Sequence, residues 1–285
     1  MGKGMIKNLV TKLQRPLVIW NRGAEAAEEM KQLYPDFVSI ASSPADVVKQ
    51  CTTTFCMLST PEASKAVFED AQGVFAGVSA GKVIVDCATL TPERMKEENE
   101  IITSKGGLFL EAPVGGSKVP AETGQLIFMC GGEESLYSSP EITAALEAMG
   151  KASFLFGPVG NGTKVKLVNN MIMGTMLASV AEGCALATAS DIPLEKLFQV
   201  LDLGAMAMPM LKAKAPSIMS GEYATNFPLK HAQKDMKFAI SMAEQAGLSL
   251  PTTEAANSVY VKAIEAGRGD DDFSAVYTVS KDLKK

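Results

Sequence analysis

The stretch that decides the fold is GPVGNGTKVKLVNN, residues 157–170, in which a glycine-rich turn leads directly into a long apolar helical pattern over residues 171–189. Within it, Lys166 and Asn170 are four residues apart, a spacing that places both side chains on one face of a helix. An ammonium and a carboxamide placed in this way can donate hydrogen bonds to one carbonyl oxygen, and the ammonium can supply a proton as that oxygen is reduced. From spacing alone, a surface lysine followed by a polar helix start is the commoner explanation.

Four further blocks and the pattern Gly-x-x-Gly-x-Gly-x-x-x-Lys-x-x-x-Asn together resemble the β-hydroxyacid dehydrogenase family. The blocks are MLSTP at 57–61, DCAT at 86–89, EAPVGGS at 111–117 and FPLKHAQKD at 227–235. Within that family, the segments 111–126, 201–206 and 272–276 are most similar to the plant-type glyoxylate/succinic semialdehyde reductases. The resemblance extends over essentially all 285 residues.

The pattern of hydrophobic residues divides the chain into two parts. Up to residue 156, short apolar runs alternate with helical segments, which is typical of a doubly wound α/β sheet. We expect strands over 17–20, 38–40, 53–58, 82–86, 108–110, 124–129 and 153–156, with helices over 24–33, 44–50, 61–75, 92–104 and 140–148. Thr91 and Pro92 predict an N-cap and a first helical residue, and residues 111–117 predict a loop.

Beyond Gly162 only helical periodicity remains, so we expect an all-helical second domain. Its predicted helices cover 171–189, 194–203, 210–219, 230–246 and 252–266. The resemblance implies a Rossmann-type NADP-binding domain over residues 1–159 and an all-α domain over 160–285, bridged by a helix over 163–190.

The beginning of the chain departs from the family pattern. A helical segment starts at Met1 and a strand follows at 17–20, which is the second half of a βαβ unit without its first strand. In the family the missing strand leads into Gly-x-Gly-x-Met-Gly, and this chain starts at the last two letters, so only Gly2, the glycine that packs the helix, is retained. We expect a start codon assigned too late; the alternative is a shortened protein with a damaged cofactor site.

Inside this fold, the residues after the second strand select the cofactor. An acidic residue there would bind the ribose 2′-hydroxyl, but this chain has Asn21 and Arg22. Because a guanidinium suits a 2′-phosphate, we expect NADPH rather than NADH. The resemblance also assigns Leu58, Ser59 and Thr89 to cofactor contacts, although ordinary turn chemistry explains Ser59 or Thr89 taken singly.

The resemblance assigns substrate and further cofactor contacts to two more segments. Backbone N–H groups of Gly115, Gly116 and Ser117 would hold a substrate carboxylate. The family usually has serine at position 115, and losing one hydrogen bond to a charged group costs roughly 1.5 to 3 kcal/mol, which Ser117 could offset. Phe227 and Asp235 would line the substrate pocket and Lys234 would contact the cofactor; otherwise Lys234 and Asp235 would be a solvated surface pair.

Composition narrows the class of protein. The chain has 47% apolar and 21% charged residues and a net charge of −5. Because the net charge is negative, we do not expect a nucleic-acid-binding surface. Five cysteines without a CxxC pair and a single histidine argue against a disulfide framework and against a metal site, and they fit a cytoplasmic, reducing environment. Polar residues interrupt the run from 171 well short of ~18 apolar residues, so we expect a buried helix rather than a membrane span.

These observations predict an enzyme that reduces small carboxylate-bearing aldehydes or oxo acids, such as glyoxylate and succinic semialdehyde, with NADPH. Lys166 would be the proton donor, Asn170 would hold the geometry, and the methionine-rich helices suggest a homo-oligomer. One alternative is an NAD-dependent dehydrogenase of the 3-hydroxyisobutyrate type. The other is a non-catalytic assembly subunit, like the chromatin-associated relative that lacks the catalytic lysine. An organellar form stays open, because a targeting peptide would precede the missing strand.

Overall fold

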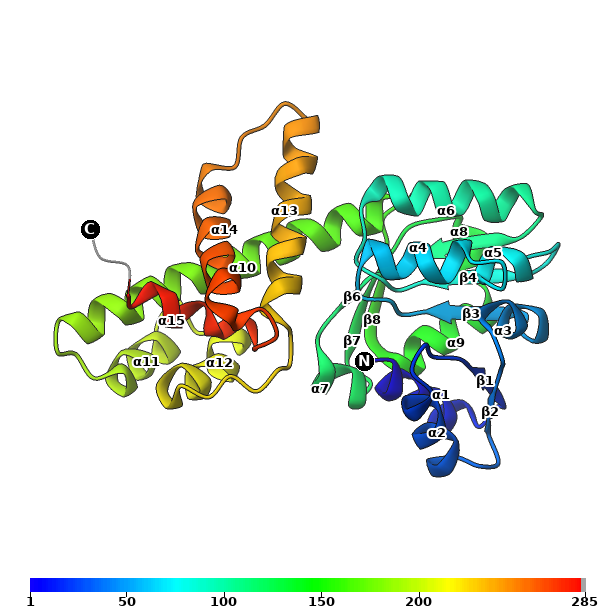
Figure 1. Ribbon diagram of the computed structural model, residues 1–285, viewed down its shortest axis with the longest axis horizontal. Helices are drawn as coiled ribbons and strands as arrows, with labels where there is room; N and C mark the ends of the chain where they lie inside the picture. Colours follow the sequence, from blue (N-terminus) through cyan, green and yellow to red (C-terminus); the bar gives the residue numbers. More distant parts are fainter. Residues whose placement is uncertain (283–285) are drawn as a thin grey trace. The chain divides into compact units, whose positions relative to one another are not determined.

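The computed structural model describes residues 1–282 and consists of two compact units (Figure 1). The first unit runs from Met1 to Lys166 and the second begins at Leu167. The boundary falls inside one long helix, α10 (Asn161–Ala189), which starts in the first unit and continues into the second. The α/β part followed by a helical part confirms the predicted fold class.

Parallel strands form the centre of the first unit. β3 (Thr53–Cys56), β4 (Val83–Asp86) and β5 (Leu108–Glu111) pair side by side in that order. All four residues of β4 are buried, as expected for a strand covered by helices on both faces. β1 (Leu17–Ile19) and β2 (Val38–Ile40) pair with each other as a separate parallel sheet.

A third sheet continues from β5. β7 (Leu126–Cys130) lies between β6 (Val114–Gly115), which is antiparallel to it, and β8 (Gly150–Leu155), which is parallel. Glu111 and Gly131 exchange both backbone hydrogen bonds at 3.0 Å, so the end of β5 is joined to the end of β7.

Helices fill the connections of the first unit, and several begin as their sequences predict. Ser43, Thr60 and Thr91 each accept a hydrogen bond from a first-turn amide and are each followed by proline, which confirms the predicted cap at Thr91. The helices are α1 (Gly2–Leu13), α2 (Ala24–Leu33), α3 (Pro44–Gln50), α4 (Pro61–Glu69), α5 (Val74–Gly77), α6 (Pro92–Ser104), α7 (Lys118–Glu122), α8 (Glu134–Tyr137) and α9 (Pro140–Met149).

Three predictions for the first unit are wrong. Residues 61–75 are two helices, because Asp70 turns the chain with its carboxylate on the Gln72 amide at 2.8 Å. The segment 111–117 is not all loop, since it contains the end of β5 and all of β6. In α1 the closely packed glycine is Gly4, whose Cβ would lie 2.6 Å from the Ala121 carbonyl carbon, whereas a Cβ at Gly2 would meet nothing within 4 Å.

The second unit is helical around one apolar core. By length and composition α10 could cross a membrane, with a mean hydropathy of 1.4 in its 18-residue window, but core helices meet the same criterion. Its residues Leu177, Ala181 and Cys184 are fully buried in this core. The other elements are α11 (Leu194–Leu203), α12 (Pro209–Ser220), α13 (Leu229–Gln245), α14 (Pro251–Ala263), a π turn (Ile264–Arg268), a 3-10 turn (Phe273–Ala275) and α15 (Val276–Ser280).

Candidate active site

The carboxylate of Glu111, at the end of β5, holds the turn that begins α10. Its Oε1 accepts hydrogen bonds from the Gly160 and Gly162 amides at 2.6 and 2.8 Å. Its Oε2 accepts from the Thr163 hydroxyl at 2.7 Å and from the Thr163 amide at 3.3 Å. Burial raises the pKa of Glu111, and these hydrogen bonds oppose that rise. A carboxylate at a helix N-terminus also complements the helix dipole, so Glu111 fixes the start of the helix that carries Lys166.

Glycines make this close approach possible. A Cβ at Gly131 would lie 2.2 Å from Glu111 Oε1, and a Cβ at Gly162 would lie 2.2 Å from the Met129 carbonyl oxygen. Gly160 has a φ of 102°, which a residue with a side chain rarely adopts. The glycine-rich sequence at 157–162 is therefore required by packing against the strand ends.

Lys166 and Asn170 lie on the buried stripe of α10. Their exposed fractions are 6% and 3%, whereas Lys164 and Asn169 are exposed on the same turns. The explanation of Lys166 as a surface lysine is therefore wrong. A long cationic side chain on a buried helical stripe is uncommon without a polar partner or a function.

Asn170 is bonded to Asp235 of α13. Asn170 Nδ2 donates to Asp235 Oδ2 at 2.6 Å, and Lys234 Nζ lies 3.0 Å from Asp235 Oδ1. Asp235 is 1% exposed, so Lys234 and Asp235 are not a solvated surface pair. Lys234 Nζ also lies over the Phe238 ring, 5.0 Å from its centroid.

Phe227 is positioned by a buried ion pair that the sequence did not reveal. Asp272 Oδ2 accepts from Lys214 Nζ at 2.7 Å and from the Phe227 amide at 3.2 Å. Its Oδ1 accepts from the Ser274 hydroxyl at 2.7 Å. The Phe227 ring packs edge-on against Phe273, with the centroids 5.4 Å apart. Asp272 thus fixes the backbone that precedes α13.

We expect replacement of Asp272 by alanine to lower the free energy of unfolding by about 3 to 5 kcal/mol, because it leaves the Lys214 ammonium buried and unpaired. Burial alone would raise the pKa of Asp272, but hydrogen bonds from Lys214 and Ser274 bring it below its usual value. The stability from this lowered pKa is therefore present above the usual aspartate pKa and is lost as pH falls through the folded value. Urea unfolding at several pH values measures both effects. The exposed acid Asp270 is the control, and equal behaviour of Asp270→Ala and Asp272→Ala would contradict the assignment.

The residues predicted to contact the cofactor follow the carboxyl ends of parallel strands, where ligands bind in such sheets. Leu58 and Ser59 follow β3 and Thr89 follows β4, and the register pairs Cys56 with Asp86, so these two loops are neighbours. Asn21 and Arg22 follow β1 and are exposed; the Asn21 amide donates to the Gly23 carbonyl at 2.8 Å. Among the described residues, no side chain caps the start of α1, at Gly2. These residues are therefore candidates for contacts with a nucleotide cofactor.

Comparison with known proteins agrees with this geometry. Residues 1–160 match the model described as the NAD binding domain of 6-phosphogluconate dehydrogenase. Residues 160–280 match the one described as NAD-binding of NADP-dependent 3-hydroxyisobutyrate dehydrogenase. The chain belongs to the β-hydroxyacid dehydrogenase family. This confirms the resemblance on which the prediction of an oxidoreductase depends.

The chain is similar over nearly its whole length to two named proteins and to one solved structure. Glyoxylate/succinic semialdehyde reductase 1 of Arabidopsis thaliana is 43% identical over 281 residues, which are 99% of this chain and 95% of the relative. Cytokine-like nuclear factor N-PAC of Homo sapiens is 35% identical over 277 residues, 97% of this chain but 49% of that protein. The structure of Mycobacterium tuberculosis 3-hydroxyisobutyrate dehydrogenase with L-serine has a TM-score of 0.84 at 25% identity, covering 98% of this chain and 95% of the other.

At the glycine loop, position 115 carries glycine where the family resemblance predicts serine. Gly115 lies in β6 opposite Ile127, and a Cβ there would be 3.2 Å from Met129 Cε, which is a flexible group. Gly116 is exposed with a φ of 117°, and Ser117 precedes α7. Because the nearest group to such a Cβ is flexible, packing does not require glycine at position 115.

The structure brings some predicted residues together within each unit. Asn170, Lys234 and Asp235 form one bonded group in the helical unit, and Ser59 and Thr89 lie on neighbouring loops in the first unit. A surface hollow of about 490 Å³ lies elsewhere in the helical unit, beside Tyr223 and Tyr277. None of the predicted residues lines it, so its size does not make it the reaction site.

Proposed function

We propose that this chain is an NADPH-dependent reductase of small carboxylate-bearing aldehydes and oxo acids, of which glyoxylate and succinic semialdehyde are the prototypes. The observation that carries the proposal is the burial of Lys166 one helical turn before Asn170, on a helix whose first turn is fixed by Glu111. The relative named as a glyoxylate/succinic semialdehyde reductase, 43% identical over nearly the whole chain, supports the substrate class.

In this mechanism the residues of the chain bind, orient and protonate the substrate. When bound, NADPH supplies the hydride that reduces the carbonyl carbon. Lys166 Nζ donates a hydrogen bond to the carbonyl oxygen, which draws electron density from the carbon, and then transfers its proton to the alkoxide to give the hydroxy acid. Asn170 lies one helical turn after Lys166 and donates a hydrogen bond to Asp235. In this proposal it holds the geometry around the reacting carbonyl group. Gly115, Gly116 and Ser117 are proposed carboxylate contacts, and Phe227 and Asp235 are proposed pocket residues.

The proposed cofactor contacts are Asn21, Arg22, Leu58, Ser59, Thr89, Lys234 and the start of α1 at Gly2. Arg22→Asp is expected to raise the Kd for NADPH by about 10- to 100-fold, because the 2′-phosphate loses charge-assisted hydrogen bonds and meets a carboxylate. The same variant should bind NADH at least as well as wild type, since an acid can accept from the 2′-hydroxyl. Titration of the quenching of protein fluorescence by each cofactor gives both constants. An unchanged ratio of the two constants would remove Arg22 from the site.

Substrate assays distinguish this function from the NAD-dependent alternative. Consumption of NADPH is measured with glyoxylate and with succinic semialdehyde, and formation of NADH is measured with 3-hydroxyisobutyrate. The proposal expects turnover in the first two assays and slow or no turnover in the third. Preferred oxidation of 3-hydroxyisobutyrate with NAD would replace the proposal by the dehydrogenase alternative.

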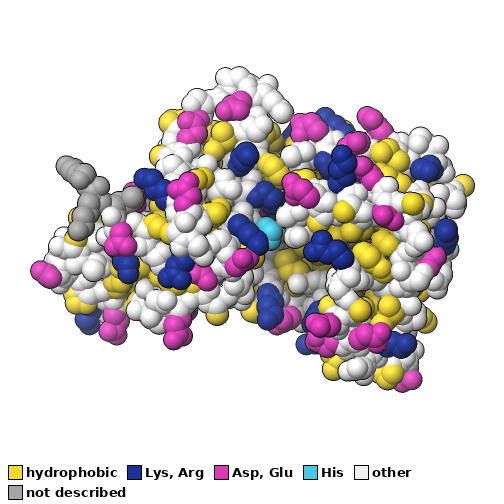
Figure 2. Space-filling view, in the orientation of Figure 1, with side chains coloured by type: hydrophobic (Ala, Val, Ile, Leu, Met, Phe, Trp, Pro, Cys, Tyr) yellow, Lys and Arg dark blue, Asp and Glu magenta, His cyan; other side chains and the backbone are white. Residues whose placement is uncertain are grey.

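Assembly and compartment are further parts of the proposal. Exposed large apolar side chains on α10 and α11, including Leu186, Val200 and Leu203, support a homo-oligomer. Five free thiols among the described residues fit the cytoplasm. Positive and negative side chains are interspersed on the face shown in Figure 2, which agrees with a small-molecule rather than a nucleic-acid partner. Size-exclusion chromatography with light scattering tests the oligomer directly.

A further inference from the structure

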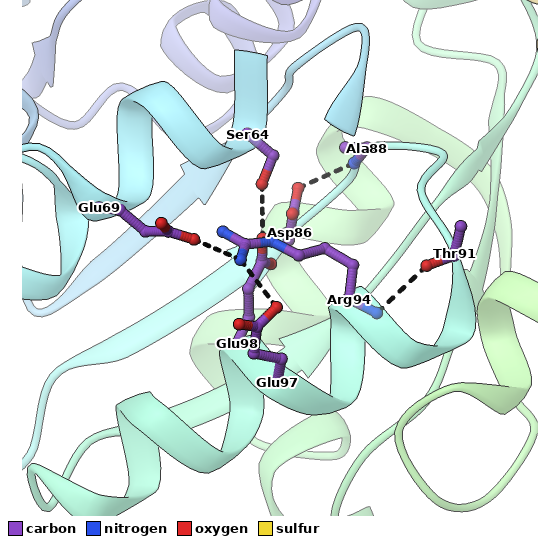
Figure 3. Close-up of polar contacts among 8 residues, drawn as sticks. All are labelled: Ser64, Glu69, Asp86, Ala88, Thr91, Arg94, Glu97 and Glu98. Carbon is purple, nitrogen blue, oxygen red and sulfur yellow. Dashed lines mark hydrogen bonds and ion pairs between the residues drawn. The ribbon is translucent and has the colours of Figure 1, made fainter. Parts of the chain in front are cut away.

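A network of acids around Arg94 connects β4, α4 and α6, and two of these acids, Asp86 and Glu98, are fully buried (Figure 3). Glu98 Oε1, on α6, accepts from the Ser64 hydroxyl at 2.5 Å and from Arg94 Nε at 2.8 Å. Arg94 Nη1 reaches back to Glu69 Oε1, on α4, at 2.7 Å. Asp86, the last residue of β4, accepts from the Ala88 amide at 2.9 Å through its Oδ1. The network thus joins two helices to the end of the central strand.

One oxygen of each buried acid has no donor. Within the described residues, Asp86 Oδ2 and Glu98 Oε2 are buried without a hydrogen-bond partner, and both residues are 0% exposed. Figure 3 shows the carboxyl groups of Asp86 and Glu98 beside each other, and each acid affects the pKa of the other. Two ionised carboxylates would repel at this distance in a site of low dielectric. A single proton held between them would satisfy both unpartnered oxygens at once.

The surroundings indicate which acid carries the proton. Burial and then repulsion from Glu98 raise the pKa of Asp86 well above its usual value. Glu98 has Arg94 and Ser64 as donors to its charged form, whereas Asp86 has only one amide. Burial raises the pKa values of the nearby thiols of Cys56 and Cys87 well above the usual value, so these thiols are neutral.

Most charged groups around the pair are already engaged, although Arg94 Nη2 is buried without a hydrogen-bond partner among the described residues. The guanidinium of Arg94 also binds Glu97 at 2.9 Å, on the exposed side of α6. Glu111 is the register neighbour of Asp86 on β5, but its carboxylate is taken up by the first turn of α10. Arg94 is the cation beside the pair; its Nε binds Glu98, and its charge only partly opposes the raised pKa of Asp86.

We propose that Asp86 is a neutral carboxylic acid that donates a hydrogen bond to the Glu98 carboxylate, and that this shared proton fixes the two loops at the NADPH site. α4 begins directly after Ser59 and Thr60, and α6 begins after Thr89 and Thr91. Because Glu98 binds Ser64 of α4 and would bind Asp86 of β4, it ties together the elements on which both loops depend. The role at the loops rests on the proposed function; the shared proton does not.

Infrared spectroscopy tests the shared proton without any cofactor. We expect the difference spectrum of wild type minus Asp86→Asn at neutral pH to contain the carbonyl band of a protonated carboxyl group. The matched control is Glu97→Gln, which removes an exposed acid from the same arginine and should leave that band in place. If Asp86→Asn does not fold, Glu98→Gln must shift the band by changing its acceptor. The proposal would be overturned if no such band were lost in Asp86→Asn or, where that variant does not fold, shifted in Glu98→Gln.

The dependence of stability on pH is the second readout. Between the usual aspartate pKa and the raised folded value, the folded chain holds a proton that the unfolded chain has released, so stability falls as pH rises through this window. Asp86→Asn carries an amide that does not titrate. In this pH window, the slope of the free energy of unfolding against pH should therefore lose the contribution of one proton. An unchanged slope in Asp86→Asn would contradict the assignment of the proton to Asp86.

NADPH affinity tests the role of the pair at the loops. Asp86→Leu leaves Glu98 Oε2 without a donor and is expected to raise the Kd for NADPH about tenfold, whereas Asp86→Asn, which keeps a donor, should stay near wild type. Equal affinity of Asp86→Leu and wild type would limit the pair to a structural role and overturn the second half of the proposal. If wild type itself does not bind NADPH, the proposed function fails, and the infrared band still decides on the proton.

Discussion

Replacement of Lys166 with alanine is expected to lower kcat for glyoxylate reduction by roughly 10³-fold, because the substrate oxygen loses both the hydrogen bond that polarises it and its proton donor. The Kd for NADPH should be unchanged, since the ammonium acts on the substrate carbonyl rather than on the nucleotide. Steady-state kinetics with saturating NADPH give kcat, and fluorescence titration gives the Kd.

Lys164 provides the matched control for this experiment. It lies on the same turn of α10 but is exposed, and its ammonium is 3.1 Å from the Asn161 side-chain oxygen. Lys164→Ala should therefore retain wild-type kinetics. If Lys166→Ala lost cofactor affinity and activity to the same degree, the lysine would have a structural role and would not be the proton donor.

Glu111→Ala is expected to have the second large effect. It removes the acceptor of the Gly160, Gly162 and Thr163 donors, all of which are buried. Leaving such donors unsatisfied should lower the free energy of unfolding by about 3 kcal/mol. Because the first turn of α10 would no longer be fixed, Lys166 should move and kcat should fall by about 10²-fold. Urea unfolding and steady-state kinetics measure the two effects.

Glu111→Gln removes the negative charge but keeps a side chain of nearly the same size, so it separates the effects of these two properties. Glutamine keeps one oxygen for the Gly160 and Gly162 amides but presents an amide group to Thr163, so an intermediate loss of stability and rate is expected. A Glu111→Ala variant with wild-type stability would show that the α10 turn does not depend on this carboxylate.

Local rules were sufficient for much of the fold. Caps such as Thr91, with proline following, fix where helices begin regardless of distant residues, and the helices 24–33, 44–50, 92–104 and 194–203 were placed correctly from sequence. The errors occurred where a distant or polar contact decides the backbone. Residues 61–75 are helical in pattern, but the Asp70 turn and the packing of Gly73 against the carbonyls of 67 and 68 break the helix.

In the candidate site, too, some features follow from local sequence and others depend on tertiary packing. Lys166 and Asn170 share a helical face by spacing alone, so the sequence predicted their relation. Their burial, and the hydrogen bond from Asn170 to Asp235 across 65 residues, depend on tertiary packing. In the sequence, Glu111 is only one residue of a motif, because its hydrogen-bond partners lie 49 to 52 residues further along the chain. The sequence feature that could indicate this contact is an acid at a strand end together with a glycine-rich helix start.

In the proposed reaction, Lys166 protonates an oxo acid as NADPH reduces it. The most direct measurement is turnover of glyoxylate by the wild-type chain and by Lys166→Ala with NADPH carrying deuterium at the transferable position, followed by mass spectrometry of the hydroxy acid. We predict deuterium on the carbinol carbon of glycolate with wild type, and formation of the same product roughly 10³-fold more slowly with the variant. Glycolate formed at equal rates by both proteins, or no labelled glycolate with wild type, would contradict the account.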